Sequence, residues 1–244
     1  MKTVLITGAT AGIGEAAARK FVAAGWRVIG TGRRADRLER LERELGEAFR
    51  GLELDMRDTA TFDAVAADAG PIDLLINNAG LAPPMSNLQD ADQAPIDTVI
   101  DTNIAGLVAI TRALLPGLVA AKGAIINLSS VAATYPYKGG AVYAGSKAFV
   151  RQFSLGLRCD LAGTGVRVTS IEPGMVETEF TIVRNGGDQA ASDALYAGIN
   201  PMTADDIADI ILYVATLPPH LNINALELMP VSQSWAGFAV ERNG

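Results

Sequence analysis

The sequence predicts an α/β fold in which one parallel β-sheet carries helices on both faces. Short apolar runs alternate with amphipathic stretches of helical period along all 244 residues, which is typical of repeated strand–helix units. Glycine, asparagine and serine bound many of the apolar runs and mark turns. No linker or low-complexity segment breaks the alternation, so residues 1–244 are predicted to form a single domain.

The predicted strands are short apolar runs, and the predicted helices are the longer amphipathic segments between them. In chain order the strands are Thr3–Thr7, Arg27–Thr31, Arg50–Leu54, Leu74–Asn77, Ala124–Leu128, Val166–Ile171 and Ala225–Leu228. The helices are Gly14–Ala24, Ala35–Leu45, Thr59–Ala67, Asp92–Val119, Val142–Leu161 and Ala204–Leu217. About seven parallel strands with helices on both faces make a doubly wound sheet of the Rossmann type.

Composition narrows the classes of function. A net charge of −7 argues against a general nucleic-acid binder or a protein of acidic membranes, so an anionic ligand needs locally placed Arg, Lys or backbone amides. One cysteine excludes an internal disulfide, and one histidine leaves too few soft ligands for a typical zinc site. We therefore expect a small-molecule ligand and no metal.

The chain is expected to act in the cytoplasm and not in a membrane. Its uninterrupted apolar runs fall well below the ~20 residues of a membrane-spanning helix, so no transmembrane segment is predicted. Met1–Gly8 runs into a strand and a glycine turn, without the apolar region and cleavage site of a signal peptide.

The turn after the first strand, Thr7–Gly14, predicts a dinucleotide site. Its G-x3-G-x-G spacing lets glycine form the tight turn, admit a pyrophosphate to the backbone and bring helix and strand close. The alternative is a tight turn without a ligand. The cofactor contacts assigned to this turn are Gly8, Thr10, Gly12, Ile13 and Gly14.

The residues after the second strand indicate NADP(H) rather than NAD(H). An NAD-preferring site places a carboxylate there to bind the ribose hydroxyls, whereas this chain has Arg33 and Arg34. Arginine offers charge-assisted, bidentate hydrogen bonds to a 2′-phosphate. The alternative is a solvated basic pair that starts the helix Ala35–Leu45.

Two further strand ends are candidates for cofactor contact. Asp55 and the adjacent Met56 follow the third strand, where the carboxylate could face an adenine amine or cap the next turn. Asn78, Ala79 and Gly80 follow the fourth strand, where the amide could contact the cofactor, stiffen the sheet edge, or do both.

Tyr143 and Lys147 are the predicted centre of the chemistry. Their spacing of four stacks both side chains on one face of a helix. A free phenol titrates near pH ~10, and a neighbouring ammonium is expected to lower that pKa toward neutrality. The pair alone is weak support for a catalytic role, so the assignment of these two residues depends on the surrounding motifs.

Over its full length the chain resembles the short-chain dehydrogenase/reductase family. The matching motifs are Thr7–Gly14, Asn77–Gly80, the Tyr143/Lys147 pair, Ser130, Asn103 and Pro173-Gly174 followed by Thr178. The resemblance implies that Tyr143 transfers a proton and that Lys147 lowers its pKa and binds the nicotinamide ribose. It also implies that Ser130 holds the substrate oxygen and that Asn103 anchors a water leading from Lys147 to solvent.

The resemblance extends past the sixth strand. There Pro173, Gly174, Val176 and Thr178 match the family segment that fixes the nicotinamide carboxamide. Residues 179–201, rich in Gly, Asn, Asp and Ala, are expected to form a mobile lid over the substrate, with an ordinary surface loop as the alternative.

Within the family the chain is similar to the NADP-dependent 3-hydroxy acid dehydrogenases in three stretches, Thr31–Arg34, Tyr143–Leu157 and Asn222–Pro230. That similarity implies oxidation of the C3 hydroxyl of a short 3-hydroxy acid such as serine, allo-threonine or 3-hydroxypropionate, or the reverse reduction. A carboxylate substrate needs a cation, for which Arg184 in the lid is the candidate and Lys138 the second choice. Ser130, Tyr143 and Arg184 thus make up the predicted substrate site.

Two other functions stay open. A reductase of uncharged ketones or aldehydes would use the same Ser130, Tyr143 and Lys147, and an NADP(H)-sensing protein would need no proton-transfer set. The family resemblance also implies a homo-oligomer, often a tetramer, built through the long helices that hold Asn103 and Tyr143. The apolar tail Met229–Val240, with Trp235 and Phe238, is expected to join that interface or cover the substrate.

Overall fold

A computed structural model describes residues 1–234 and shows a seven-stranded parallel sheet. The strand order is β3-β2-β1-β4-β5-β6-β9. The strands are β1 (Thr3–Thr7), β2 (Arg27–Gly32), β3 (Phe49–Glu53), β4 (Leu74–Asn77), β5 (Ala124–Leu128), β6 (Arg167–Pro173) and β9 (Ala225–Leu228). The predicted doubly wound α/β fold is confirmed, with strand bounds within two residues of those predicted.

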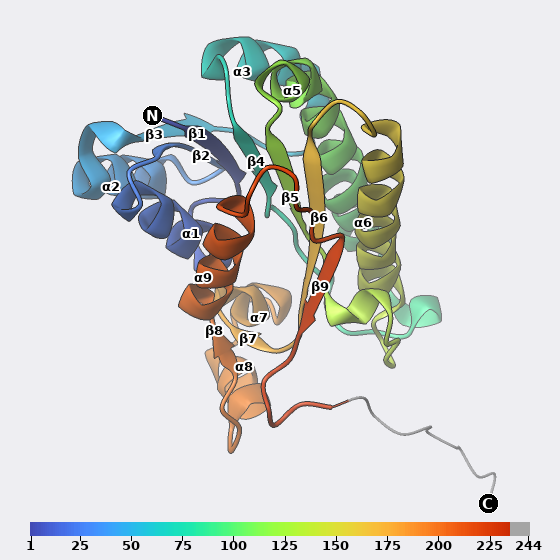
Figure 1. Ribbon diagram of the computed structural model, residues 1–244. Helices are drawn as coiled ribbons and strands as arrows, with labels where there is room; N and C mark the ends of the chain where they lie inside the picture. Colours follow the sequence, from blue (N-terminus) through green and yellow to red (C-terminus); the bar gives the residue numbers. More distant parts are fainter. Residues whose placement is uncertain (235–244) are drawn as a thin grey trace, which may run out of the picture.

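Helices cover both faces of this sheet (Figure 1). On one face α1 (Gly12–Ala23), α2 (Ala35–Leu45) and α9 (Ala204–Ala215) pack on the sheet. On the other face lie α3 (Phe62–Ala69), α5 (Leu107–Ala121) and α6 (Ala141–Asp160). Each face has its own cluster of buried apolar side chains, because a parallel sheet must be covered on both sides.

The sheet order reverses between β1 and β4, which are neighbours in space although two other strands separate them in the chain. In open α/β sheets, ligands bind outside the carboxyl ends of the strands at such a switch point. The turns after Thr7 and after Asn77 therefore meet at the position where a dinucleotide is expected.

The predicted helix Asp92–Val119 is interrupted. The structure has α4 (Gln93–Ile100), a π-helical segment at Asp101–Gly106 and then α5. The interruption coincides with close packing, because a Cβ atom at Gly106 would lie 2.2 Å from the Met56 carbonyl oxygen. A π-helical turn frequently marks a functional position, and Asn103 lies within this one.

The whole helical stretch Gln93–Ala121 is long and apolar enough to cross a membrane by length and composition alone. From the sequence no transmembrane segment was predicted, because the apolar runs are short. In the structure this stretch packs on α3, β4 and α6, as a core helix of an α/β sheet does.

Residues 179–201 form two short helices rather than an irregular loop. They are α7 (Glu179–Arg184) and α8 (Gln189–Tyr196), flanked by the paired strands β7 (Val176–Glu177) and β8 (Met202–Thr203). Side chains of Thr178 and Asp188 accept backbone hydrogen bonds and start the two helices. Figure 1 shows α7 and α8 beyond the carboxyl ends of the central strands. Trp235 and Phe238 of the predicted tail lie outside the described residues.

Candidate active site

The turn between β1 and α1 has the geometry that a pyrophosphate needs. Gly8 and Gly12 adopt positive φ angles of 70° and 52°, and a Cβ atom at Gly14 would lie 2.3 Å from the Gly8 carbonyl oxygen. Ala11, the N-cap of α1, has no side chain that could bond the first-turn amides. The helix N-terminus therefore keeps donors for an anion, so the turn fits a dinucleotide.

Asn78 ties this turn to the end of β4. Its Nδ2 atom donates to the carbonyl oxygens of Thr7, at 2.9 Å, and Gly8, at 3.1 Å. The Thr7 hydroxyl oxygen in turn accepts from the backbone amides of Asn78 and Ala79. Asn78 thus has the structural role that the sequence analysis kept open. Thr7 was not assigned there, although its place directly before the first glycine was the available signal.

The two arginines after β2 differ in their surroundings. Arg33 is exposed, whereas Arg34 donates through Nε and Nη2 to the Thr10 hydroxyl in the phosphate turn. Asp55 hydrogen-bonds the side chain and backbone of Arg57, and the side-chain bond lowers the pKa of Asp55 to about 2. This arrangement agrees with the turn-capping alternative for Asp55.

The next cofactor candidates lie in the segment after β6. Met175 donates its backbone amide to the Gln233 side chain at 2.8 Å, so the chain after β9 supports this segment. Thr178 caps α7, and a Cβ atom at Gly12 would lie 3.3 Å from the Thr178 Cβ. The structure therefore brings Thr178 against the phosphate turn, whereas Gly174 lies against Gln233 and Met229. Val176 pairs with Met202 in the small sheet.

The residues predicted to transfer the proton meet where β5 ends and α6 begins. Lys147 is buried, and its Nζ donates to the Leu128 carbonyl oxygen at 2.8 Å and lies 5.8 Å from the Tyr143 ring centroid. Ser130 acts on the Tyr143 phenol to lower its pKa, and its hydroxyl donates to the Pro173 carbonyl oxygen at 3.3 Å. Tyr143, Lys147 and Ser130 thus lie together, as expected from the sequence.

Burial dominates the protonation of these groups. It raises the pKa of Tyr143 to about 12, against the lowering effects of the Ser130 hydrogen bond and the Arg184 charge. Burial also lowers the pKa of Lys147 to about 8. Lys147 was expected to lower the pKa of Tyr143. In the structure Arg184 is the cation that opposes the rise of this pKa, and desolvation outweighs the effect of Arg184.

Asn103 is fixed by three hydrogen bonds. Its Oδ1 accepts from the Leu81 amide at 3.0 Å, and its Nδ2 donates to the Leu81 carbonyl oxygen and to the Ser146 hydroxyl. A Cβ atom at Gly80 would lie 3.3 Å from both Asn103 Oδ1 and Lys147 Nζ. Gly80 therefore keeps the space between these two groups open. Ser146 was missed by the sequence analysis, although it lies between Tyr143 and Lys147 in the motif.

Arg184 lies close to Tyr143. Its guanidinium carbon lies 5.7 Å from the Tyr143 ring centroid, and its Nη2 donates to the Tyr137 hydroxyl at 3.1 Å. The Phe180 ring, one turn earlier in α7, is 5.7 Å from that of Tyr143. The helix α7 thus brings a cation close to Tyr143, whereas Lys138 is exposed in the loop before α6.

Comparisons with known proteins agree with this geometry. The pattern of the family described as short chain dehydrogenase matches residues 2–188. The chain belongs to the short-chain dehydrogenase family. It is therefore an oxidoreductase, as the motifs predicted.

Relatives of this short-chain dehydrogenase include proteins named as dehydrogenases and proteins named as reductases. Serine 3-dehydrogenase of Agrobacterium fabrum is 62% identical over 98% of each chain. Sulfoacetaldehyde reductase 2 of Chromohalobacter salexigens is 54% identical, also over 98% of each chain. A solved structure described as the closed form of serine dehydrogenase complexed with NADP+ shares 49% identity and a TM-score of 0.96, covering 99% of this chain and all of that one.

Proposed function

We propose that the protein transfers a hydride between NADP(H) and the C3 position of a short 3-hydroxy acid or the matching 3-oxo compound. The observation that carries the substrate class is the Arg184 guanidinium 5.7 Å from the Tyr143 ring centroid. A cation at that distance can hold an acid group while the hydroxyl of the same small molecule reaches the phenol. The name of the 62% identical relative, serine 3-dehydrogenase, supports the same class.

NADP(H) supplies the acceptor or donor of the hydride when bound. The glycine turn and the N-terminus of α1 would hold its phosphates, and Arg33 and Arg34 its 2′-phosphate. Lys147 and Tyr143 would bind the nicotinamide ribose. The other proposed contacts are Gly8, Thr10, Gly12, Ile13, Gly14, Asp55, Met56, Asn78, Ala79, Gly80, Pro173, Gly174, Val176 and Thr178.

The side chains at the end of β5 and the start of α6 would handle the proton. With its pKa raised, Tyr143 is protonated at neutral pH and donates its Oη proton to a substrate carbonyl during reduction. Ser130 Oγ would hold the substrate oxygen and stabilise the charge that develops on it. In the oxidative direction the Tyr143 phenolate accepts the substrate proton, and Lys147 and Asn103 would lead that proton toward solvent.

A sulfonate is the second candidate for the acid group. Arg184 can pair with a sulfonate as readily as with a carboxylate, because both present several anionic oxygens to a guanidinium. The relative named sulfoacetaldehyde reductase 2, at 54% identity, favours this reading. Both candidates require the Arg184 guanidinium to bind the acid group.

The deciding experiment is a substrate panel followed by one variant pair. We expect turnover with NADP+ on L-serine, L-allo-threonine, 3-hydroxypropionate or 3-hydroxyisobutyrate, or with NADPH on sulfoacetaldehyde, and much less with NAD(H). In Arg184→Ala the KM of the preferred acid should rise by about tenfold or more, as expected for loss of a charge-assisted contact. Lys138→Ala is the matched control and should leave that KM unchanged.

Other outcomes would change the proposal. Activity on neutral secondary alcohols alone would keep the dehydrogenase and remove the acid site. Binding of NADPH without turnover of any member of the panel would favour a sensor. A KM that changes in Lys138→Ala but not in Arg184→Ala would move the anion site to the loop before α6.

We further propose that residues 1–244 form one cytoplasmic domain, with residues 179–201 as a lid, and that copies of it assemble as a homo-oligomer, with a tetramer favoured. The helical stretch Gln93–Ala121 supports assembly, because only 33% of its most apolar 18-residue window is buried within one copy. Size-exclusion chromatography with light scattering measures the number of copies.

A further inference from the structure

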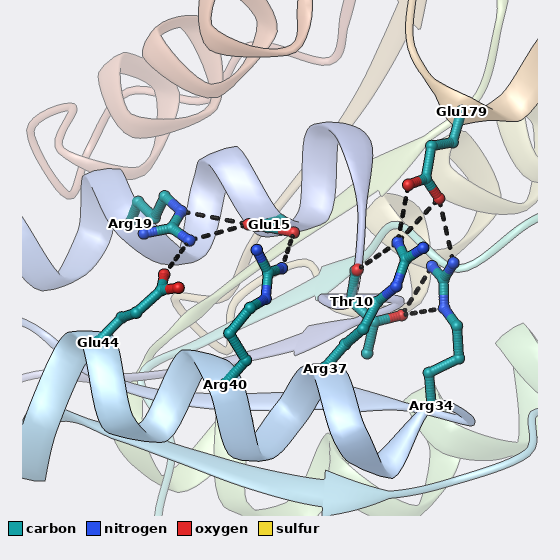
Figure 2. Close-up of polar contacts among 8 residues, drawn as sticks. All are labelled: Thr10, Glu15, Arg19, Arg34, Arg37, Arg40, Glu44 and Glu179. Carbon is teal, nitrogen blue, oxygen red and sulfur yellow. Dashed lines mark hydrogen bonds and ion pairs between the residues drawn. The ribbon is translucent and has the colours of Figure 1, made fainter.

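One carboxylate joins the lid to the cofactor side of the protein. Glu179 is the first residue of α7, and both of its oxygens lie 2.8 Å from Arg37 Nη1. Arg34 Nη1 donates to the same carboxylate at 3.0 Å. Figure 2 shows the two guanidiniums converging on Glu179, although 145 and 142 residues separate it from them in the chain. We call this group of Arg34, Arg37 and Glu179 the clasp.

The clasp lies directly on the phosphate turn. Arg34 bonds the Thr10 hydroxyl through Nε, at 3.3 Å, and Nη2, at 3.1 Å. Arg37 donates to the Thr10 carbonyl oxygen at 3.3 Å (Figure 2). Both arginines therefore stand between the lid and the turn, where the adenosine end of the cofactor is expected.

The next arginine on α2 shows that this arrangement is not a general feature of the helix. Arg40 pairs with Glu15 of α1 at 2.8 Å, and Glu15 also binds Arg19 (Figure 2). The Arg40–Glu15 pair connects two helices on the same face of the sheet, and the Arg19–Glu15 pair lies within α1. Arg37, one turn before Arg40, instead takes its carboxylate partner from the lid.

The clasp holds two positive charges against one negative charge. A 2′-phosphate would suit the arginines better, because a phosphate monoester carries about −1.5 to −2 charges at neutral pH and three acceptor oxygens. The clasp residues are 31% to 42% exposed, so their ion pairs are weak enough to be displaced. Burial works to raise the pKa of Glu179, but its bonds to Arg37 and Arg34 outweigh this and keep it below its usual value.

We propose that Glu179 is a specificity-determining residue whose carboxylate competes with the 2′-phosphate of the cofactor for Arg34 and Arg37. Binding of the phosphate then releases the start of α7 from the arginines. The choice of cofactor is thereby linked to the lid, because the lid carries Arg184. A nucleotide without the 2′-phosphate leaves the clasp intact. The inference rests on the proposed use of NADP(H) and adds Arg37 to the phosphate ligands.

The test measures equilibrium binding of two nucleotide fragments by titration calorimetry, without turnover. The probes are 2′,5′-ADP, which carries the 2′-phosphate, and 5′-AMP, which lacks it. Glu179→Gln removes the charge and keeps the size. We expect it to tighten 2′,5′-ADP about threefold to tenfold, the scale of displaced surface ion pairs, and to leave 5′-AMP within about twofold.

Two further variants separate competition from general electrostatics. Glu177→Gln removes an exposed carboxylate two residues earlier and should not tighten 2′,5′-ADP. In an Arg37→Gln background, Glu179→Gln should have a smaller effect, because one contested partner is gone. Equal tightening of both fragments, equal effects of Glu177→Gln and Glu179→Gln, or unchanged or weaker 2′,5′-ADP binding in Glu179→Gln would overturn the proposal.

The wild type distinguishes failure of this inference from failure of its premise. If it binds 2′,5′-ADP no tighter than 5′-AMP, the proposed NADP(H) preference fails and the competition fails with it. If it prefers 2′,5′-ADP but Glu179→Gln does not bind it tighter, only the role of Glu179 is wrong.

Discussion

The central strands and the lid meet at one site but are held in place by different forces. In β1, Val4, Leu5 and Ile6 have no exposed surface, because helices cover both faces of the sheet. In the lid, Val183 is 61% and Leu195 51% exposed, and polar contacts hold the helices. Apolar burial thus fixes the first region, whereas a few hydrogen bonds and ion pairs fix the second.

The proposed functional residues are divided between the same two regions, the sheet side and the lid. Ser130 follows the end of β5, and Tyr143 and Lys147 stand on α6, where packing sets their positions to the precision that proton transfer needs. Arg184, which binds the acid group in the proposed function, and Glu179, which competes with the 2′-phosphate, stand on the lid. Loosening the lid should therefore change which ligands bind, while changes on the sheet side should remove the reaction itself.

The largest effect is expected from Tyr143→Phe. The change removes the proton carrier but keeps the ring that packs against Phe180, so kcat should fall by about 10² to 10⁴. Steady-state kinetics measures the loss, and NADPH fluorescence titration should show binding like that of the wild type. Turnover near the wild-type rate would remove Tyr143 from the chemistry.

A second prediction concerns pH. Because the pKa of Tyr143 is raised to about 12, the phenolate that oxidation requires is scarce at neutral pH and increases by up to about tenfold per pH unit. The oxidation rate should therefore rise from pH 7 toward pH 10, whereas reduction uses the protonated phenol and should not rise. Initial rates in both directions across this range test the difference. A rate of oxidation independent of pH would contradict the raised pKa or place proton transfer outside the slow step.

The smallest effect is expected from Tyr196→Phe, which should change the stability of the protein only slightly. The hydroxyl of Tyr196 donates to the Val176 carbonyl oxygen at 2.9 Å and shares a hydrogen bond of 2.7 Å with Thr181. Losing both should lower the free energy of unfolding by about 1 kcal/mol, because packing of the sheet does not depend on them. Urea denaturation measures the change, with the exposed Tyr213→Phe on α9 as the control.

Limited proteolysis tests whether the lid and the sheet core open separately. Tyr196→Phe should speed cleavage within residues 179–201 while the sheet core stays resistant. A loss of several kcal/mol in global unfolding would show instead that the lid folds as one unit with the sheet.

Much of the scaffold could be predicted from the sequence, because it depends on neighbours in the chain. The bounds of β1, β4, β5, β9 and α2 agree with the prediction, since apolar runs and glycine turns are local signals. The helices α7 and α8 could not be predicted in this way. Their composition resembles that of a loop, and the Thr178 and Asp188 caps that start them are visible only once the backbone is in place.

The same distinction holds for the site. By itself the sequence determined the family motifs, the four-residue spacing of Tyr143 and Lys147, and the arginines after β2. Only the tertiary structure decided that burial raises the pKa of Tyr143 and that the clasp joins Arg34 and Arg37 to Glu179. The physical reason is that motifs and turns are set by neighbours along the chain, whereas desolvation and ion pairing depend on which distant segments the fold brings together.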